Sequence, residues 1–241
     1  MKKIKIIVAL TAMLAVAASL IACSSLDVVG KTSITSFNEV LKIIPDNVKE
    51  DDRNAGWSLT SPDGSVRFIW SADYSKSPLH DVMLEFDAQP FLDAGLDPSA
   101  LPENYAYYKG DAMGSMGSDM LMVGKKLGES DKVSGTSNAL SAYELIVNNY
   151  RDTINYHTTL DHYGVKLGEG NMFEWAKDME INGYDDSNQD KDIVFVLNPE
   201  PLIAAGVDPE KVEGWIYTQV SIEENGKTEQ VWKLLKPFNL K

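Results

Sequence analysis

The alternation of apolar and polar residues predicts mostly strands, with a longer helix at two points. Helical spacing starts near Ser36 and near Ser141, and each serine is followed three residues later by a glutamate, as in a capping box. Apolar residues then recur every three or four positions, up to Pro45 in the first case and to about Tyr156 in the second. We therefore expect two amphipathic helices that begin at these serines.

Strand-type alternation fills most of the remaining sequence. Runs of this kind lie at residues 57–59, 66–70, 81–87, 104–108, 120–127, 165–167, 173–175, 192–198, 214–222 and 228–235. Strands dominate and do not alternate regularly with helices, which favours antiparallel pairing. The expected fold class is α+β, with mainly antiparallel sheet and helices packed on one face.

The same order of elements occurs twice because the sequence itself is repeated. The stretch "DVMLEFDAQPFLDAGLDP" from Asp81 to Pro98 aligns without gaps to "DIVFVLNPEPLIAAGVDP" from Asp192 to Pro209. Further pairs in the same order are Gly56 with Gly164, Trp70 with Trp175 and Tyr105 with Trp215. Chance similarity would not keep this order, so we expect a tandem duplication with one longer N-terminal helix and one short helix in each unit.

Within the repeat, the phrases "PFLDAGLDP" and "PLIAAGVDP" are expected to form the short helix and its end. Pro90 and Pro201 suit the first turn of a helix, where no backbone N–H is needed. Gly95 and Gly206 suit the left-handed residue that ends a helix, and the apolar residue after each is placed for a Schellman cap. We therefore interpret the phrase as a structural element that ends a helix and starts a turn, and not as a binding site.

The first 23 residues carry a targeting signal. Three lysines precede an apolar run that is too short, and too quickly followed by polar residues, to serve as a stop-transfer helix. The sequence Leu20-Ile21-Ala22-Cys23 then resembles the lipobox of bacterial lipoproteins. The resemblance implies that residues 1–22 are removed and that Cys23 receives acyl chains such as palmitate, which would anchor the protein to the outer side of the cell membrane.

The expected layout after the signal peptide follows from this boundary and from the repeat. Residues 23–32 would be the lipidated cysteine and a short tether, residues 33–132 the first repeat unit, and residues 133–241 the second. Cys23 is the only cysteine, so a lipidated chain has no thiol or disulfide with which to stabilise these units.

Charge excludes some partners. The chain has 36 acidic and 22 basic residues, and without the three lysines of the signal peptide its net charge is −17. Such an acidic body repels phosphate backbones, which argues against nucleic acid as a partner. It also repels anionic headgroups, so the acyl chains on Cys23 would have to hold the protein at the bilayer.

Two groups of residues are candidate sites. Asp186, Asn188, Asp190 and Asp192 alternate in an acidic stretch, and in a loop their oxygens could converge on Ca²⁺. A solvated hairpin tip is the simpler interpretation, because the stretch lacks the glycine and the twelfth-position glutamate of a calcium-binding loop. The aromatic residues Trp57, Tyr105, Tyr107, Trp215 and Tyr217 would line a sugar- or peptide-binding groove between the halves if they are not part of the core.

These observations favour a lipid-anchored extracytoplasmic protein that binds or scaffolds an envelope protein or glycan without catalysis. No nucleophile elbow, zinc spacing or phosphate-binding loop is present in the sequence. Two alternatives stay open. One is an envelope enzyme that acts on glycan or peptide through carboxylates in the groove between the halves, and the other is a calcium-responsive module.

Overall fold

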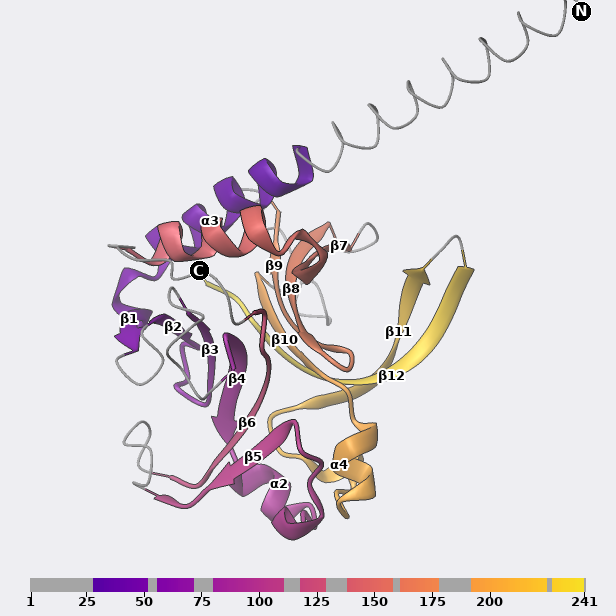
Figure 1. Cartoon of the computed structure of the whole chain (residues 1–241). Coiled ribbons are helices and arrows are strands. Elements are labelled where there is room, and N and C mark those ends of the chain that lie inside the picture. The colour runs from indigo at the N-terminus through magenta and orange to yellow at the C-terminus, as the bar shows by residue number, and fades with distance from the viewer. Residues whose placement is uncertain are drawn as a thin grey trace, which may run out of the picture.

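Two six-stranded antiparallel sheets form the framework of the described part of the protein (Figure 1). The computed structural model describes residues 28–51, 56–71, 80–110, 118–128, 138–157, 161–177, 192–224 and 227–240. The predicted α+β class and the antiparallel pairing are confirmed.

The first sheet has the strand order β1-β2-β3-β4-β6-β5. Its strands are β1 (Val48–Asp51), β2 (Gly56–Thr60), β3 (Val66–Ser71), β4 (Val82–Asp87), β5 (Tyr105–Tyr108) and β6 (Met120–Lys125). A helix of residues 28–43 and the 3-10 turn η1 (Pro45–Asn47) precede it, and α2 (Gln89–Asp93) and η2 (Pro98–Ala100) join β4 to β5.

The second sheet has the order β7-β8-β9-β10-β12-β11, which is the order of the first sheet with every strand number raised by six. Its strands are β7 (Ile154–His157), β8 (His162–Gly168), β9 (Asn171–Ala176), β10 (Ile193–Leu197), β11 (Ile216–Glu224) and β12 (Lys227–Phe238). The helices and 3-10 turns of the second repeat take the same places in the order of elements as those of the first repeat. They are α3 (Ala139–Asn149), η4 (Arg151–Thr153), α4 (Glu200–Ala204) and η5 (Pro209–Lys211).

Strand register shows which residues are equivalent in the two sheets. Trp70 pairs with Trp57, and Trp175 pairs with Tyr163, so the two core tryptophans are equivalent, as expected. The predicted match of Gly56 with Gly164 is wrong, because the register makes His162 of β8 the equivalent of Gly56, whereas Gly164, two residues further along β8, is the equivalent of Ser58 of β2. The apolar alternation, and not the shared glycine, sets the register of these strands.

The two longer helices differ from the prediction in where they begin and end. Ser36 lies inside the helix of residues 28–43, which also includes the last five residues of the expected tether. The N-cap of α3 is Asn138, whose Oδ1 accepts a hydrogen bond from the Ser141 N–H at 2.9 Å. Neither predicted capping box exists. The helix α3 also ends before Tyr156, which lies on the unpredicted strand β7.

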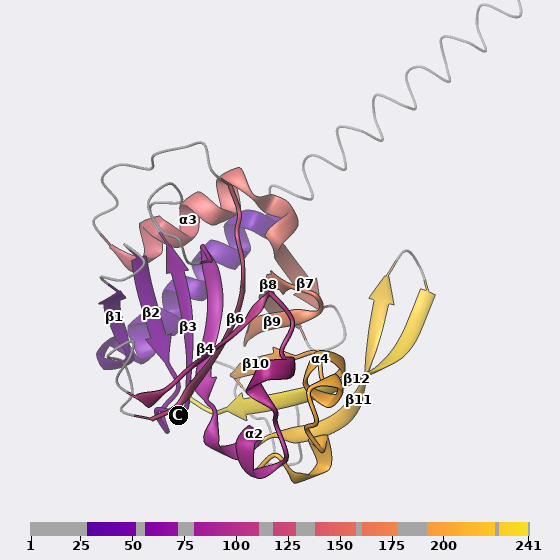
Figure 2. The ribbon, with the colours of Figure 1, turned by 60° about the horizontal axis from the view of Figure 1, so that its bottom comes forward.

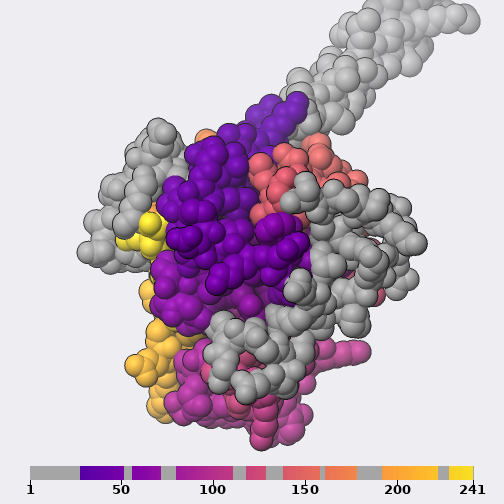
Figure 3. All heavy atoms as spheres, turned by 90° about the vertical axis from the view of Figure 1, so that its left-hand side faces the viewer, coloured from indigo at the N-terminus to yellow at the C-terminus, as the bar shows by residue number. Residues whose placement is uncertain are grey.

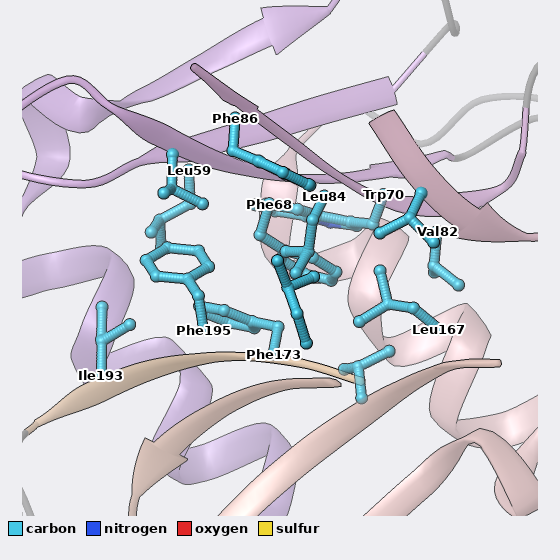
Figure 4. Close-up of a cluster of buried hydrophobic side chains, with 14 of the residues drawn as sticks. Leu59, Phe68, Trp70, Val82, Leu84, Phe86, Leu167, Phe173, Ile193 and Phe195 are labelled. Carbon is cyan, nitrogen blue, oxygen red and sulfur yellow. The ribbon is translucent and has the colours of Figure 1, made fainter. Parts of the chain in front are cut away.

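A single apolar core lies between the sheets. Phe68 of β3 stacks on the equivalent Phe173 of β9, with ring centroids 4.4 Å apart and ring planes 9° from parallel (Figure 4). The helix of residues 28–43 and α3 lie side by side against this core, and Phe37 contacts Tyr143 at a centroid distance of 4.3 Å. In the space-filling view, second-repeat atoms lie directly against first-repeat atoms (Figure 3). The repeats therefore share one core.

Each repeat also holds a helix of the other by hydrogen bonds. The Trp70 indole N–H donates to the Ala139 carbonyl of α3 at 2.9 Å. The Trp175 indole N–H donates to the Ser36 hydroxyl at 3.1 Å, and that hydroxyl donates in turn to the Ala176 carbonyl at 3.0 Å. Ser36 is thus buried because it joins the first helix to the second sheet.

The repeated phrase forms the predicted helix ends. In both copies the glycine has a positive φ, 103° at Gly95 and 96° at Gly206. The Leu96 N–H bonds the Phe91 carbonyl and the Val207 N–H bonds the Leu202 carbonyl, which is the Schellman pattern. This part of the interpretation is confirmed.

The two phrases also bind each other, which the sequence did not predict. The Asp97 N–H donates to the Ala205 carbonyl at 2.8 Å, and the Asp208 N–H donates to the Ala94 carbonyl at 2.9 Å. A Cβ atom on Gly95 would lie 2.8 Å from the Gly206 carbonyl oxygen, and the reverse distance is the same. The phrase is therefore both a helix end and a reciprocal joint between the repeats.

Candidate functional site

The last two strands extend well beyond the shared core. β11 has nine residues and β12 has twelve, whereas their counterparts β5 and β6 have four and six. Together β11 and β12 form a hairpin that projects from the body of the protein (Figures 1 and 2). The greatest difference in strand length between the two repeats is therefore in this hairpin.

One face of the projecting hairpin carries an uncharged set of side chains. Tyr217 pairs with Leu234, Gln219 with Trp232, and Ser221 with Gln230, so these six side chains point to the same side. Leu234 is buried in the core, which shows that this side continues the inner face of the sheet. We call the other five residues, Tyr217, Gln219, Ser221, Gln230 and Trp232, the hairpin face.

An exposed aromatic stack lies at the centre of the hairpin face. The rings of Tyr217 and Trp232 are 4.4 Å apart between centroids and 21° from parallel. Trp232 is 48% exposed, which is unusual for a tryptophan side chain, whereas Tyr217 also packs against the core. Beside the stack, the Gln230 amide donates to the Ser221 hydroxyl at 2.5 Å. The face is thus a flat aromatic platform with amide groups next to it.

The base of the hairpin is fixed to the first repeat. Trp215, directly before β11, lies 5.6 Å from Phe86 and 5.5 Å from Phe91 between ring centroids. Lys236 of β12 lies over the Trp215 ring at 5.9 Å and forms an ion pair of 3.3 Å with Asp63 in the β2–β3 turn. These contacts hold the platform in a set position relative to the rest of the protein.

A further contact supports the outer edge of the hairpin. The His157 Nε2 atom of β7 lies 3.2 Å from the Ser221 carbonyl oxygen of β11. His157 also pairs with His162 across β7 and β8, a neighbourhood that the sequence spacing did not predict because β7 was not predicted. The contact connects the two edge strands of the second sheet.

A second polar group lies on the opposite, outer face of the second sheet. Glu174 is only 4% exposed, and its Oε1 atom has no hydrogen-bond partner among the residues that the structure describes. The Lys233 ammonium, also buried, donates to the Gly170 carbonyl at 2.8 Å. Burial raises the pKa of Glu174 to about 7, and the positive charge of Lys233 opposes the rise. Val194, Val196 and Leu235 form the apolar cluster of this face.

The five aromatic residues singled out in the sequence all pack against the shared core or belong to it. Tyr105 is buried, and its hydroxyl donates to the Asn171 Oδ1 atom at 3.3 Å. The Tyr107 hydroxyl bonds the Asp119 carboxylate. Trp57 and Trp215 are partly buried. Only Tyr217 also belongs to the hairpin face, where it supports Trp232.

Trp232 is one of the strand aromatics that could line a groove on sequence grounds, but it is not among the five predicted groove residues, because alternating aromatic residues in a strand are usually core. A weak signal for it exists. The run from Ile216 to Ile222 is long for a strand and free of charge in a strongly acidic chain, and its alternate residues are polar. Such a run indicates a strand that leaves the core while remaining uncharged.

The predicted calcium ligands are only partly placed. Asp186, Asn188 and Asp190 lie outside the described residues. Asp192 is buried, and its Oδ2 atom accepts a hydrogen bond from the Leu240 N–H at 2.6 Å; the equivalent Asp81 accepts from the Leu127 N–H at 2.6 Å. This shared bond gives Asp192 a structural role. Within the described ranges, no three histidine, aspartate or glutamate side chains are grouped as a metal ion would require.

The predicted targeting segment, with Cys23, also lies outside the described residues. Among the helices that are described, none is long and apolar enough to cross a bilayer. Comparisons of the chain with protein-family models, with curated proteins and with solved structures find no match. The function must therefore be argued from the residues themselves.

Proposed function

We propose that this is a lipid-anchored extracytoplasmic protein that binds an envelope partner through the hairpin face, without catalysis of its own. The observation that carries the proposal is the exposed Tyr217–Trp232 stack on a hairpin whose base is fixed to the body. An exposed tryptophan loses the stabilisation that burial would give it, so its exposure on a rigid support suits a side chain used for binding.

The two repeats arose, in this proposal, by tandem duplication of one unit. Support comes from the identical strand order, the equivalent core residues Trp70 and Trp175, and the reciprocal bonds between the repeated phrases. The first copy keeps short strands at β5 and β6, and the second copy has the extended hairpin. Duplication would leave one copy to maintain the core while the other acquired a binding surface.

The anchor would hold the protein close to the membrane. Four residues separate Cys23 from residue 28, where the described helix begins. Even a fully extended chain would place the start of that helix within about 18 Å of the lipidated cysteine. The short helices α2 and α4 lie at the far end from this point, and the hairpin projects sideways between the two ends (Figure 1).

Lipidation is tested by metabolic labelling of bacteria that express the full chain or its Cys23→Ala variant. Labelled palmitate is expected on the wild-type protein and absent from the variant, because Cys23 is the only cysteine. A wild-type protein that takes up no label, or a variant that takes up as much, would contradict the anchor.

Binding is tested with a soluble chain of residues 24–241 and washed cell-envelope fragments. Trp232→Ala is expected to reduce binding at least tenfold while the protein stays folded, with a slightly lower unfolding midpoint, since Trp232 is half exposed and its main contact is the stack with Tyr217. The control is Ile203→Ala, which removes an exposed apolar side chain from α4, away from the hairpin face. Equal binding by wild type and Trp232→Ala would exclude the hairpin face as the binding surface.

A further inference from the structure

We propose that the hairpin face binds a neutral saccharide chain, with a sugar ring stacked on Trp232 and its hydroxyl groups bonded to Gln219 and Gln230. This inference rests on the proposed binding function and names the class of ligand.

The shape of the aromatic stack suits a flat, partly apolar ring. Tyr217 covers one side of the Trp232 indole, and Trp232 still exposes about half of its surface. The C–H face of a pyranose ring is apolar and can cover an indole, which buries apolar area on both partners. Because Tyr217 already supports the indole, little side-chain freedom is lost when a ligand binds.

The polar groups of the face match hydroxyl groups. Gln219 pairs directly across from Trp232, and Gln230 lies two residues before it on the same side of β12; both amides are exposed. A side-chain amide donates through its NH₂ group and accepts through its oxygen, and a sugar hydroxyl does both as well. The Ser221 hydroxyl, bonded to Gln230, adds a third group of the same kind.

The charge of the protein favours a neutral ligand. The hairpin face contains no aspartate, glutamate, lysine, arginine or histidine, whereas the chain without its signal peptide has a net charge of −17. Anionic polymers would be repelled by this charge, and the face offers no basic side chain that could compensate.

The size of the face favours a small ligand over a protein surface. Stable protein interfaces use roughly 20–30 residues on each partner. The hairpin face offers five, spread over two strands about 4.8 Å apart and over about 14 Å between Tyr217 and Ser221. A few sugar rings fit on such a strip, whereas a folded protein would need a much larger patch.

The test measures binding of tetrasaccharides by calorimetry to the chain of residues 24–241. The probes are the glucose and N-acetylglucosamine tetramers, with a galacturonic acid tetramer as the anionic counterpart. We expect binding of at least one neutral probe and none of the anionic one. Trp232→Ala should weaken binding at least tenfold, Trp232→Phe and Gln219→Ala several-fold, and Ile203→Ala not at all. Cooperative urea transitions confirm that the variants are folded.

Pretreated envelope fragments separate a failure of this inference from a failure of the proposed function. An excess of the neutral tetramer that binds in solution is expected to abolish Trp232-dependent binding to the fragments, and protease treatment of the fragments is expected to leave that binding intact. The opposite pattern would mean a protein partner, which overturns the saccharide and keeps the binding module. Absence of any binding that depends on Trp232, to fragments or to either neutral probe, would overturn both.

Discussion

Glu174 occupies the position in the second sheet that Ile69 occupies in the first. Its side chain lies on the outer face, and it pairs with Gly164 of the neighbouring strand. A Cβ atom at Gly164 would come within 3.1 Å of the Glu174 side chain, so the glycine leaves room for the carboxyl group. Lys233 similarly takes the place of Met120. The second repeat thus has ionisable residues at two buried positions where the first repeat has apolar ones, and burial is costly for a charge.

The pKa of Glu174 makes stability depend on pH. Because the pKa is raised from 4.5 to about 7, the folded protein keeps a proton that the unfolded chain releases between these values. The free energy of unfolding should therefore fall as pH rises through this range, by up to about 3 kcal/mol, and stay lowered above it. Glu174→Gln should remove this fall and increase stability at pH 8 but not at pH 4.5.

Urea unfolding at a series of pH values measures this effect. Glu229→Gln is a suitable control, since Glu229 is exposed on the same strand as Lys233. If the curve of Glu174→Gln against pH runs parallel to that of the wild type, the carboxyl group is not the source of the pH dependence.

At the level of elements, the joint between the repeated phrases explains why both copies keep their glycine. Gly206→Ala is expected to destabilise the protein by about 2–4 kcal/mol, because alanine is strained at a positive φ and its Cβ would meet the Gly95 carbonyl. Gly64→Ala is the matched control, with a φ of 76° and no atom within 4 Å of the added Cβ. It should cost only about 1 kcal/mol.

The difference between these two variants in urea unfolding isolates the steric part of the joint. Equal losses at Gly206 and Gly64 would mean that the reciprocal contact adds nothing beyond backbone strain.

The sequence predicts those elements whose apolar pattern is continuous. The runs around Trp70 and Trp175 alternate and are buried, so their strands were predicted correctly. The strands β1 and β7 were missed because their residues are partly exposed and show no alternation. Ser36 was taken for a helix cap because its real partner, the end of β9, is 140 residues away in the sequence.

The candidate site was harder to predict than the fold. Whether an aromatic residue in a strand, such as Trp232, is buried or exposed depends on how far the opposite sheet extends over it. The extent of that sheet cannot be predicted from the sequence around Trp232. The same holds for Glu174, whose burial depends on what packs on the outer face of its sheet.

For the whole molecule, one shared core predicts one cooperative unit. Phe68 stacks on Phe173 across the two sheets, and each repeat bonds a helix of the other through its core tryptophan. We expect β3 and β9 to unfold together, since neither sheet keeps its apolar face covered without the other.

Hydrogen exchange at increasing urea, followed on peptides from β3 and β9, measures this coupling. Coincident transitions are expected. Loss of protection in one sheet at clearly lower urea than in the other would show that the repeats are separate folding units.

The reciprocal contact of Gly95 and Gly206 has a consequence for how the two copies can evolve. Each position is occupied by the carbonyl group of the other phrase, so a side chain gained at one site is unfavourable until the opposite backbone moves. We therefore expect selection to act on the two glycines together and not on each one separately. Among descendants of the same ancestor, we expect chains that keep both glycines or lack both, and few that keep only one.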